Sequence, residues 1–200
     1  MSDNPTNPFV NEWIIAANQS PYRASPSMFG VLPATDSTTA GFQHFSFTGM
    51  NPNILNSTLS KGDGQPQYFI TTHTTTPGYT ILTNVQGRNE VLIEWSHGCA
   101  MVEIAGALQK QYASMFLQLS PDRRFRIMNF AGDRYAWMAR DKNICVREAQ
   151  SKERGEGCLA QICKEEGIIR IEISPIAISR GLLAPVALST ILLQSGRVID

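Results

Sequence analysis

The densest group of side chains that could bind a ligand is a short basic run past the middle of the chain. Arg123, Arg124 and Arg126 occur within four consecutive positions. Planar guanidinium groups match the paired oxygens of a phosphate with two parallel hydrogen bonds. These three arginines therefore predict a phosphate or headgroup site. The alternative is a solvated hairpin face whose charges bind nothing.

A second candidate combines a histidine and a cysteine, His97 and Cys99, which are separated by Gly98. A histidine beside a cysteine can generate a thiolate nucleophile. Catalytic pairs of this kind are normally brought together by the fold, so adjacency in sequence is weak evidence. A strand end with a small buried thiol is the alternative. The sequence favours a protein that is not an enzyme, with His97 and Cys99 as weak catalytic candidates.

The other cysteines show no pattern that is typical of a metal site. Cys145, Cys158 and Cys163 lack the paired Cys-x-x-Cys spacing of structural zinc sites. We predict that they are small core residues with reduced thiols, because the chain shows no export signal. A phosphate-binding glycine-rich loop, a dinucleotide fingerprint and a nucleophile elbow are all missing from the sequence. The sequence thus predicts neither a metal ion nor a cofactor.

These residues must be positioned by β-strands, because most of the chain reads as short alternating or β-branched runs separated by turn signals. The predicted strands cover 42–47, 54–59, 68–76, 79–85, 90–96, 101–104, 125–130, 135–139, 144–148, 159–164 and 168–173. Helical spacing between Leu108 and Leu119 predicts one short helix there. This density of strands favours a meander, sandwich or barrel. Strands and helices do not alternate, which argues against a parallel α/β sheet.

The last apolar segment, Leu182 to Gln194, predicts a helix that is buried on all sides. Its apolar residues cover nearly every face of a helical projection, and such helices are normally enclosed by other structure. Pro185 and Gly196 are typical of the first helical position and of the position just past the end. About 12 residues span about 18 Å, less than the roughly 30 Å of a bilayer core. We therefore predict a core helix and no transmembrane segment.

Composition limits the classes of partner. The formal net charge is zero and 17% of the residues are charged, which gives no electrostatic reason to expect nucleic acid. Residues 1–40 contain five of the eleven prolines and predict a partly disordered arm rich in Pro, Asn and Ser, with the folded domain over 41–200. The first ten residues lack the features of a signal peptide, so we expect a cytoplasmic protein. The sequence indicates no oligomeric state.

Several of the predicted strands carry motifs of a known family. The segment from Arg88 to Trp95 resembles the apolar-x-Ile-x-Trp strand of a large group of fungal, mostly basidiomycete, proteins of unknown function. Phe125, followed by Gly132 to Trp137, resembles the Phe and Gly-x-x-Tyr-x-Trp hairpin of that group. Asn56 to Leu59 and Tyr68 to Thr72 fit its earlier strands, and the closing apolar helix fits too.

This family resembles a branch of the Tubby C-terminal-like and LURP-one-related fold, and the likeness covers residues 42–195. In that fold a closed antiparallel barrel, which leaves no free sheet edge, has about twelve strands around a hydrophobic C-terminal helix. Some relatives bind phosphoinositide headgroups through basic side chains, and others resemble phospholipid scramblases. None of their binding positions aligns with this sequence, and a shared fold does not imply a shared function.

Three functions are compatible with these observations. The leading hypothesis is a non-catalytic module that binds a lipid headgroup, such as a phosphoinositide, or a protein, at Arg123, Arg124 and Arg126. The second is a small enzyme with a site at the barrel mouth near His97 and Cys99. The third is an intracellular interaction protein that binds its partner through the arm at 1–40.

Overall fold

The computed structural model describes residues 41–73, 78–96, 99–140, 142–149 and 157–199. The arm predicted at 1–40 lies outside the described residues, and so does His97.

The described residues form a mainly β structure with a single antiparallel sheet of thirteen strands. The strands are β1 (Gln43–Thr48), β2 (Ser57–Lys61), β3 (Pro66–His73), β4 (Gly78–Asn84), β5 (Asn89–Ser96), β6 (Cys99–Ile104), β7 (Leu108–Tyr112), β8 (Leu117–Leu119), β9 (Phe125–Phe130), β10 (Asp133–Arg140), β11 (Asn143–Glu148), β12 (Ala160–Glu165) and β13 (Ile168–Ile173). Their order in the sheet is β7-β6-β5-β4-β3-β2-β1-β13-β12-β11-β10-β9-β8. Nearly all neighbours in the sheet are also neighbours in sequence. The exception is β1, which pairs with the last strand, β13.

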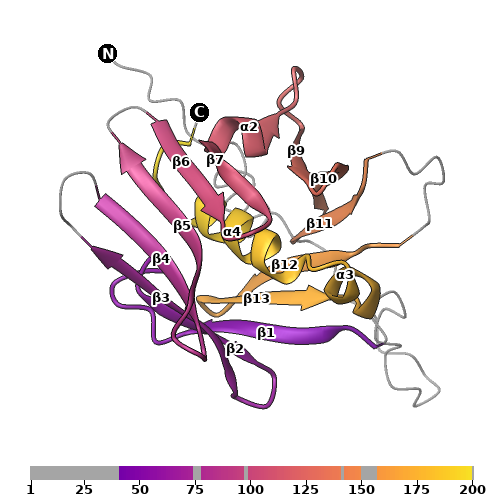
Figure 1. The fold of residues 1–200 in the computed structure, drawn as a ribbon. Coiled ribbons are helices and arrows are strands. Elements are labelled where there is room, and N and C mark those ends of the chain that lie inside the picture. The colour runs from indigo at the N-terminus through magenta and orange to yellow at the C-terminus, as the bar shows by residue number, and fades with distance from the viewer. Residues whose placement is uncertain (1–40, 74–77, 97–98, 141, 150–156, 200) are drawn as a thin grey trace, which may run out of the picture.

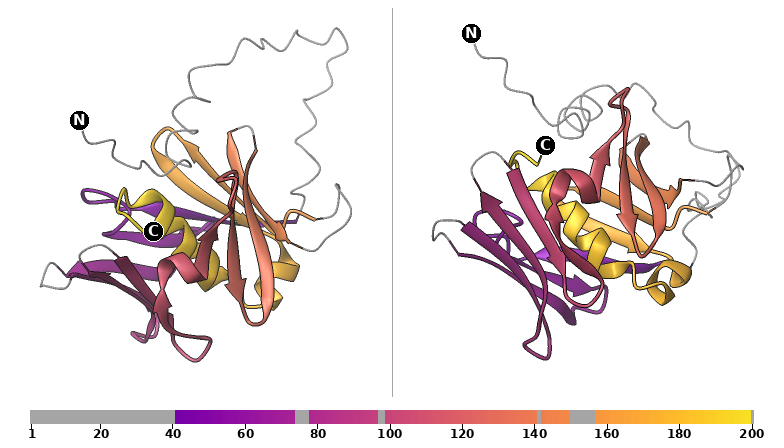
Figure 2. Two further views of the ribbon diagram at one scale, coloured as in Figure 1. Left: turned by 90° about the horizontal axis from the view of Figure 1, so that it is seen from above. Right: turned by 45° about the horizontal axis from the view of Figure 1, so that its top comes forward.

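The sheet bends around the C-terminal helix, but hydrogen bonds do not close it. β7 and β8 are its two end strands, and no ladder joins them in the described part of the chain. The short helix α2 (Ala113–Phe116) connects them, and Figures 1 and 2 show it beside the gap between the two halves of the sheet. The structure therefore has a continuous sheet of thirteen strands rather than a ladder closed on itself.

The segment from Leu108 to Leu119 departs from the sequence prediction. A single helix was expected there, whereas the chain forms β7, a helix of four residues and β8. Of the apolar residues whose spacing suggested a helix, Phe116 is buried, whereas Tyr112 and Met115 are exposed. The buried residues of this segment, Ala113, Phe116 and Leu117, lie on α2 and at the start of β8.

The predicted core helix is confirmed as α4 (Leu183–Gln194). Every residue from Pro185 to Leu193 is buried, and Figure 1 shows α4 in the middle of the molecule with strands on several sides. Gly196 has a φ of 70° just past the end, as expected for a helix terminus. Pro185 is the third helical residue rather than the first, a position that still needs no N–H donor. None of the described helices is long and apolar enough to cross a membrane.

Side chains alternate along the strands, so that each strand has an inner face toward α4 and an outer face. On β9, the hydroxyl of Ser189 in α4 donates to Met128 Sδ at 3.4 Å, which places Met128 on the inner face. Trp137 of β10 is fully buried in the core, whereas Trp95 of β5 is partly buried against it and donates from Nε1 to Thr80 Oγ1 at 2.7 Å. Both tryptophans therefore serve core packing.

A second short helix, α3 (Pro175–Ser179), precedes α4 and was not predicted. Ser174 caps it, because its Oγ accepts a hydrogen bond from the backbone N–H of Ala177 at 3.2 Å. Ser174 followed by a proline is a typical helix start. The two helices together bring the chain from the end of β13 into the interior.

Candidate functional site

The turn between β8 and β9 is held in one conformation by hydrogen bonds around Ser120 and Asp122. The Ser120 hydroxyl donates to Asp122 Oδ1 at 2.6 Å, and the backbone N–H of Arg124 donates to the same oxygen at 3.2 Å. The backbone N–H of Phe125 donates to Ser120 Oγ at 3.1 Å. The hydrogen bonds from Ser120 and Arg124 lower the pKa of Asp122, because they favour the carboxylate form.

Two of the three predicted binding arginines are exposed in this turn. Arg123, with a φ of 58°, and Arg124 follow Asp122 directly, and both side chains are exposed. Neither forms an ion pair with another described residue. The Asp122 carboxylate is occupied by the hydrogen bonds of the turn, so the two guanidinium groups are available to an external anion.

The third predicted arginine is separated from the other two. Arg126 lies on β9, where its side chain is 1% exposed and its Nη1 donates to the carbonyl oxygen of Leu117 at 2.9 Å. It is two residues from Met128 and therefore shares the inner face of the strand. It also lies directly opposite Trp137 of β10 in the register. The structure thus brings Arg123 and Arg124 together on the surface and places Arg126 in the interior.

The turn between β10 and β11 brings two further cations to the same end of the sheet. Met138 of β10 pairs with Phe125 of β9, so Arg140, two residues later, lies level with the β8–β9 turn. Arg140 and Lys142 are both exposed, and neither forms an ion pair within the described residues.

We call Arg123, Arg124, Arg140 and Lys142 the basic turn surface. The four side chains come from two neighbouring turns whose bases are joined by the β9–β10 ladder. Exposed cations attract anions, and guanidinium groups can each hold two phosphate oxygens. The arrangement can therefore bind a phosphate group. Sequence reasoning missed Arg140 and Lys142, because their proximity to Arg124 depends on the register of β9 with β10.

The histidine–cysteine candidate is only partly described. His97 lies outside the described residues, while Cys99 begins β6 and pairs with Ser96 of β5. Its side chain is half-buried and its thiol is free. Glu94 on the same hairpin forms an ion pair with Lys110 of β7. This ion pair lowers the pKa of Glu94 and raises that of Lys110, chiefly through their hydrogen bond.

Of the other three cysteines, which were predicted to be small core residues, Cys163 is buried, whereas Cys145 and Cys158 are only half-buried. Cys145 lies on β11 between Ile144 and Val146, which both face the core, so Cys145 is on the outer face of the sheet. Its Sγ lies 2.7 Å from Sγ of Cys158. Cys163 is buried but lies outside the core cluster. Among the described residues, no group of three His, Cys, Asp or Glu side chains could hold a metal ion.

No protein-family model matches this chain, and no curated protein does so. Among solved structures, the X-ray structure of a protein from Arabidopsis thaliana is similar, with a TM-score of 0.42 and 11% sequence identity. The match covers 74% of this chain and 88% of that chain. A similarity at this level carries no argument about function.

Proposed function

We propose that this protein is a non-catalytic binding module that recognises an anionic lipid headgroup, such as a phosphoinositide, through the basic turn surface. The observation that carries the proposal is the presence of four exposed cations in two adjacent turns, without ion-pair partners among the described residues. The proposal includes a cytoplasmic location, where such headgroups are displayed.

The number of cations sets the affinity that we expect. Each Lys or Arg near an anionic membrane contributes about 1 kcal/mol. Four such residues give about 4 kcal/mol, which corresponds to a dissociation constant of about 1 mM for purely non-specific attraction. A headgroup with several phosphates would bind more tightly, because each guanidinium can then form two charge-assisted hydrogen bonds.

Among the proposed binding residues, Arg126 is left out and Arg140 and Lys142 are added. A buried guanidinium that donates to a backbone carbonyl oxygen cannot contact a headgroup without leaving the interior. Moving it out would break that hydrogen bond and open the core beside Trp137. Arg126 is therefore assigned a structural role.

Flotation with phosphoinositide-containing vesicles tests this function. The wild-type protein should float with these vesicles and be released by added salt, because exposed charge interactions are screened within about 10 Å at 0.1 M ionic strength. The double variant Arg124→Gln and Arg140→Gln should lose about 2 kcal/mol, or roughly 30-fold in partitioning. Arg88→Gln is the matched control. Arg88 is exposed in the β4–β5 turn, whose strands lie in the other half of the sheet order.

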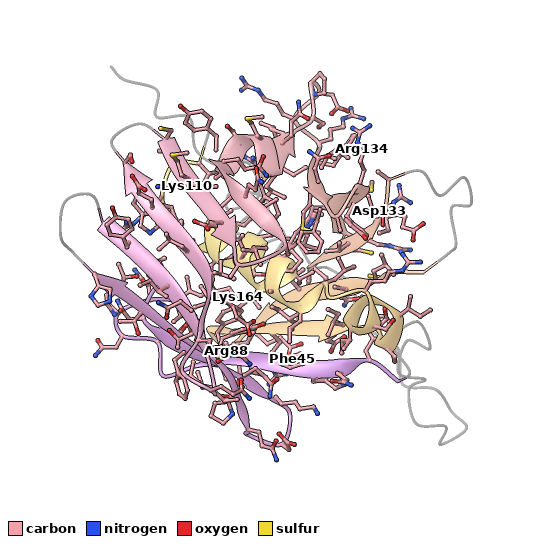
Figure 3. All side chains as sticks on the ribbon, in the orientation of Figure 1. Phe45, Arg88, Lys110, Asp133, Arg134 and Lys164 are labelled. Atoms are coloured by element: carbon pink, nitrogen blue, oxygen red, sulfur yellow. The ribbon has the colours of Figure 1, made fainter. Side chains whose placement is uncertain are left out.

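Three results would contradict the headgroup proposal. These are equal flotation with neutral vesicles, no flotation with either kind of vesicle, and an equal loss of flotation for Arg88→Gln and the double variant. Arg88 and Arg134, which lies at the β9–β10 hairpin, are in separate parts of the molecule (Figure 3). Arg88 is in the β4–β5 turn, and Arg134 is at the other end of β10 from Arg140, so neutralising either of them probes overall charge rather than the basic turn surface.

We further propose a barrel-like architecture of the Tubby-like and LURP-one-related type, in a fungal protein. The curved sheet around α4 supports a barrel, with α2 lying between the end strands in place of the last ladder. The two other functions, an enzyme using His97 and a partner site at 1–40, depend on residues outside those described. No contact or distance among the described residues favours either of them over headgroup binding.

A further inference from the structure

Cys145 and Cys158 come together although twelve residues separate them in sequence. Cys145 is in the middle of β11, whereas Cys158 precedes β12. The backbone N–H of Leu159 donates to the carbonyl oxygen of Val146 at 2.7 Å, which anchors the incoming segment against β11. The two Sγ atoms are consequently 2.7 Å apart. A disulfide bond is about 2.05 Å long, so bond formation needs a movement of less than about 1 Å.

The surroundings favour ionisation of one thiol of the pair. The hydrogen bond between the two thiols lowers the pKa of Cys145 to about 7 against the opposing effect of burial, and the positive charges of Arg140 and Arg147 act in the same direction as the hydrogen bond. The pKa of Cys158 is raised by its hydrogen bond with Cys145, by burial and by repulsion from the Cys145 thiolate. Cys145 is therefore the sulfur that ionises first, and a thiolate is the nucleophilic form of cysteine.

Neither cysteine is enclosed in the core. Cys145 and Cys158 are half-buried rather than fully buried, and Cys145 is on the outer face of the sheet. Arg147, two residues away on the same strand face, is also partly exposed. The site thus combines an ionisable thiol, a second thiol in contact with it and nearby positive charge.

We propose that Cys145 and Cys158 form a redox pair, which a small-molecule disulfide oxidises to an intramolecular disulfide by thiol–disulfide exchange. This property is separate from the proposed headgroup binding, although Arg140 of the basic turn surface is also one of the charges that act on Cys145. The neighbouring arginines favour an anionic disulfide, such as glutathione disulfide, over a cationic one.

The exchange proceeds in two balanced steps. The Cys145 thiolate attacks one sulfur of the small disulfide, forms a mixed disulfide and releases the first thiolate. Cys158 then loses its proton to solvent and attacks Sγ of Cys145, which breaks the mixed disulfide and releases the second thiolate. Both cysteine sulfurs are oxidised, and the small disulfide is reduced to two thiols. Once the Cys145 sulfur is capped, the repulsion and the hydrogen bond that held the proton on Cys158 are removed, so the second step becomes easier.

Exchange with glutathione disulfide, followed by intact mass and peptide mapping, tests this proposal on the full chain. The reduced wild-type protein should lose two hydrogen atoms and yield a peptide linked through Cys145 and Cys158. Cys158→Ser should instead stop at one bound glutathione on Cys145, and Cys145→Ser should form neither product at this site. Cys163→Ser is the matched control and should behave like wild type. The pKa of the Cys163 thiol is raised to about 11, chiefly by burial.

Two outcomes would overturn the proposal. One is a wild-type protein that carries only stable mixed disulfides, and the other is a linkage that involves Cys99 or Cys163. Peptide mapping of the wild-type protein distinguishes both of these outcomes from the expected Cys145–Cys158 linkage. The test therefore remains decisive even if a serine variant fails to fold.

Discussion

The central role of α4 predicts that shortening one of its side chains weakens the whole fold. Leu192 is fully buried within the core cluster, and the leucine-to-alanine change leaves a cavity as well as a loss of apolar burial. Such substitutions cost about 2 to 5 kcal/mol. Domains of this kind have a free energy of unfolding of about 5 to 15 kcal/mol. Leu192→Ala should therefore remove a large fraction of the total stability.

The expected shift can be measured directly. At about 2 to 4 °C per kcal/mol for a chain of this size, a loss of about 3 kcal/mol lowers the melting temperature by about 6 to 12 °C. Urea denaturation followed by tryptophan fluorescence should show a lower midpoint with an unchanged slope, because the surface exposed on unfolding stays the same.

Ile176→Ala provides the matched control. Ile176 is 58% exposed on α3, so removing its apolar atoms should change the free energy of unfolding by no more than about 0.5 kcal/mol. Equal and small effects at Leu192 and Ile176 would refute the conclusion that α4 is the packed centre of the fold.

Two further predictions concern a turn and a thiol. Ala131 and Gly132 have φ values of 52° and 85°, and a left-handed conformation costs an alanine about 1 to 2 kcal/mol. Asn before Gly suits such a hairpin, so Ala131→Asn should raise the melting temperature by about 2 to 4 °C. The control is Ala107→Asn, because φ is not positive at Ala107; this variant should give no gain in the same thermal scan. The pKa of the Cys145 thiol is lowered to about 7, and the thiolate is the reactive form. The rate of Cys145 alkylation by iodoacetamide should therefore rise with pH up to about 7 and then level off. The alkylation rate at Cys163 should keep rising toward pH 11. Peptide mapping from pH 5 to 10 measures the alkylation rates of both cysteines. A Cys145 rate that still rises at pH 9 would contradict the lowered pKa of Cys145.

Most of the strands could be predicted from local pattern and turn residues. β9 and β13 have the predicted bounds, and the others agree to within a few residues. The stretch from Leu108 to Leu119 could not be predicted in this way. Two of the apolar residues that fit the helical period, Tyr112 and Met115, are exposed, and the segment folds as β7, α2 and β8. The helical period in this segment therefore identified neither the local structure nor all of the residues that face the core.

The candidate site was predictable only in part. The arginine run was visible in the sequence, but Arg126 faces inward whereas Arg124 faces solvent. The difference arises because Arg126 is in β9, where alternation assigns it to the same face as Met128. Arg124 is still in the turn, where no such alternation applies. The start of the strand at Phe125 therefore separates a structural arginine from a candidate binding arginine.

The sequence by itself determined that Leu182 to Gln194 is a helix too apolar to remain on the surface and too short to span a bilayer. That inference needs only composition, length and period. Only the tertiary structure decided that Cys145 contacts Cys158 and that Arg140 lies level with Arg124. The physical reason is that both juxtapositions depend on strand register, which is set jointly by the packing of all thirteen strands around α4.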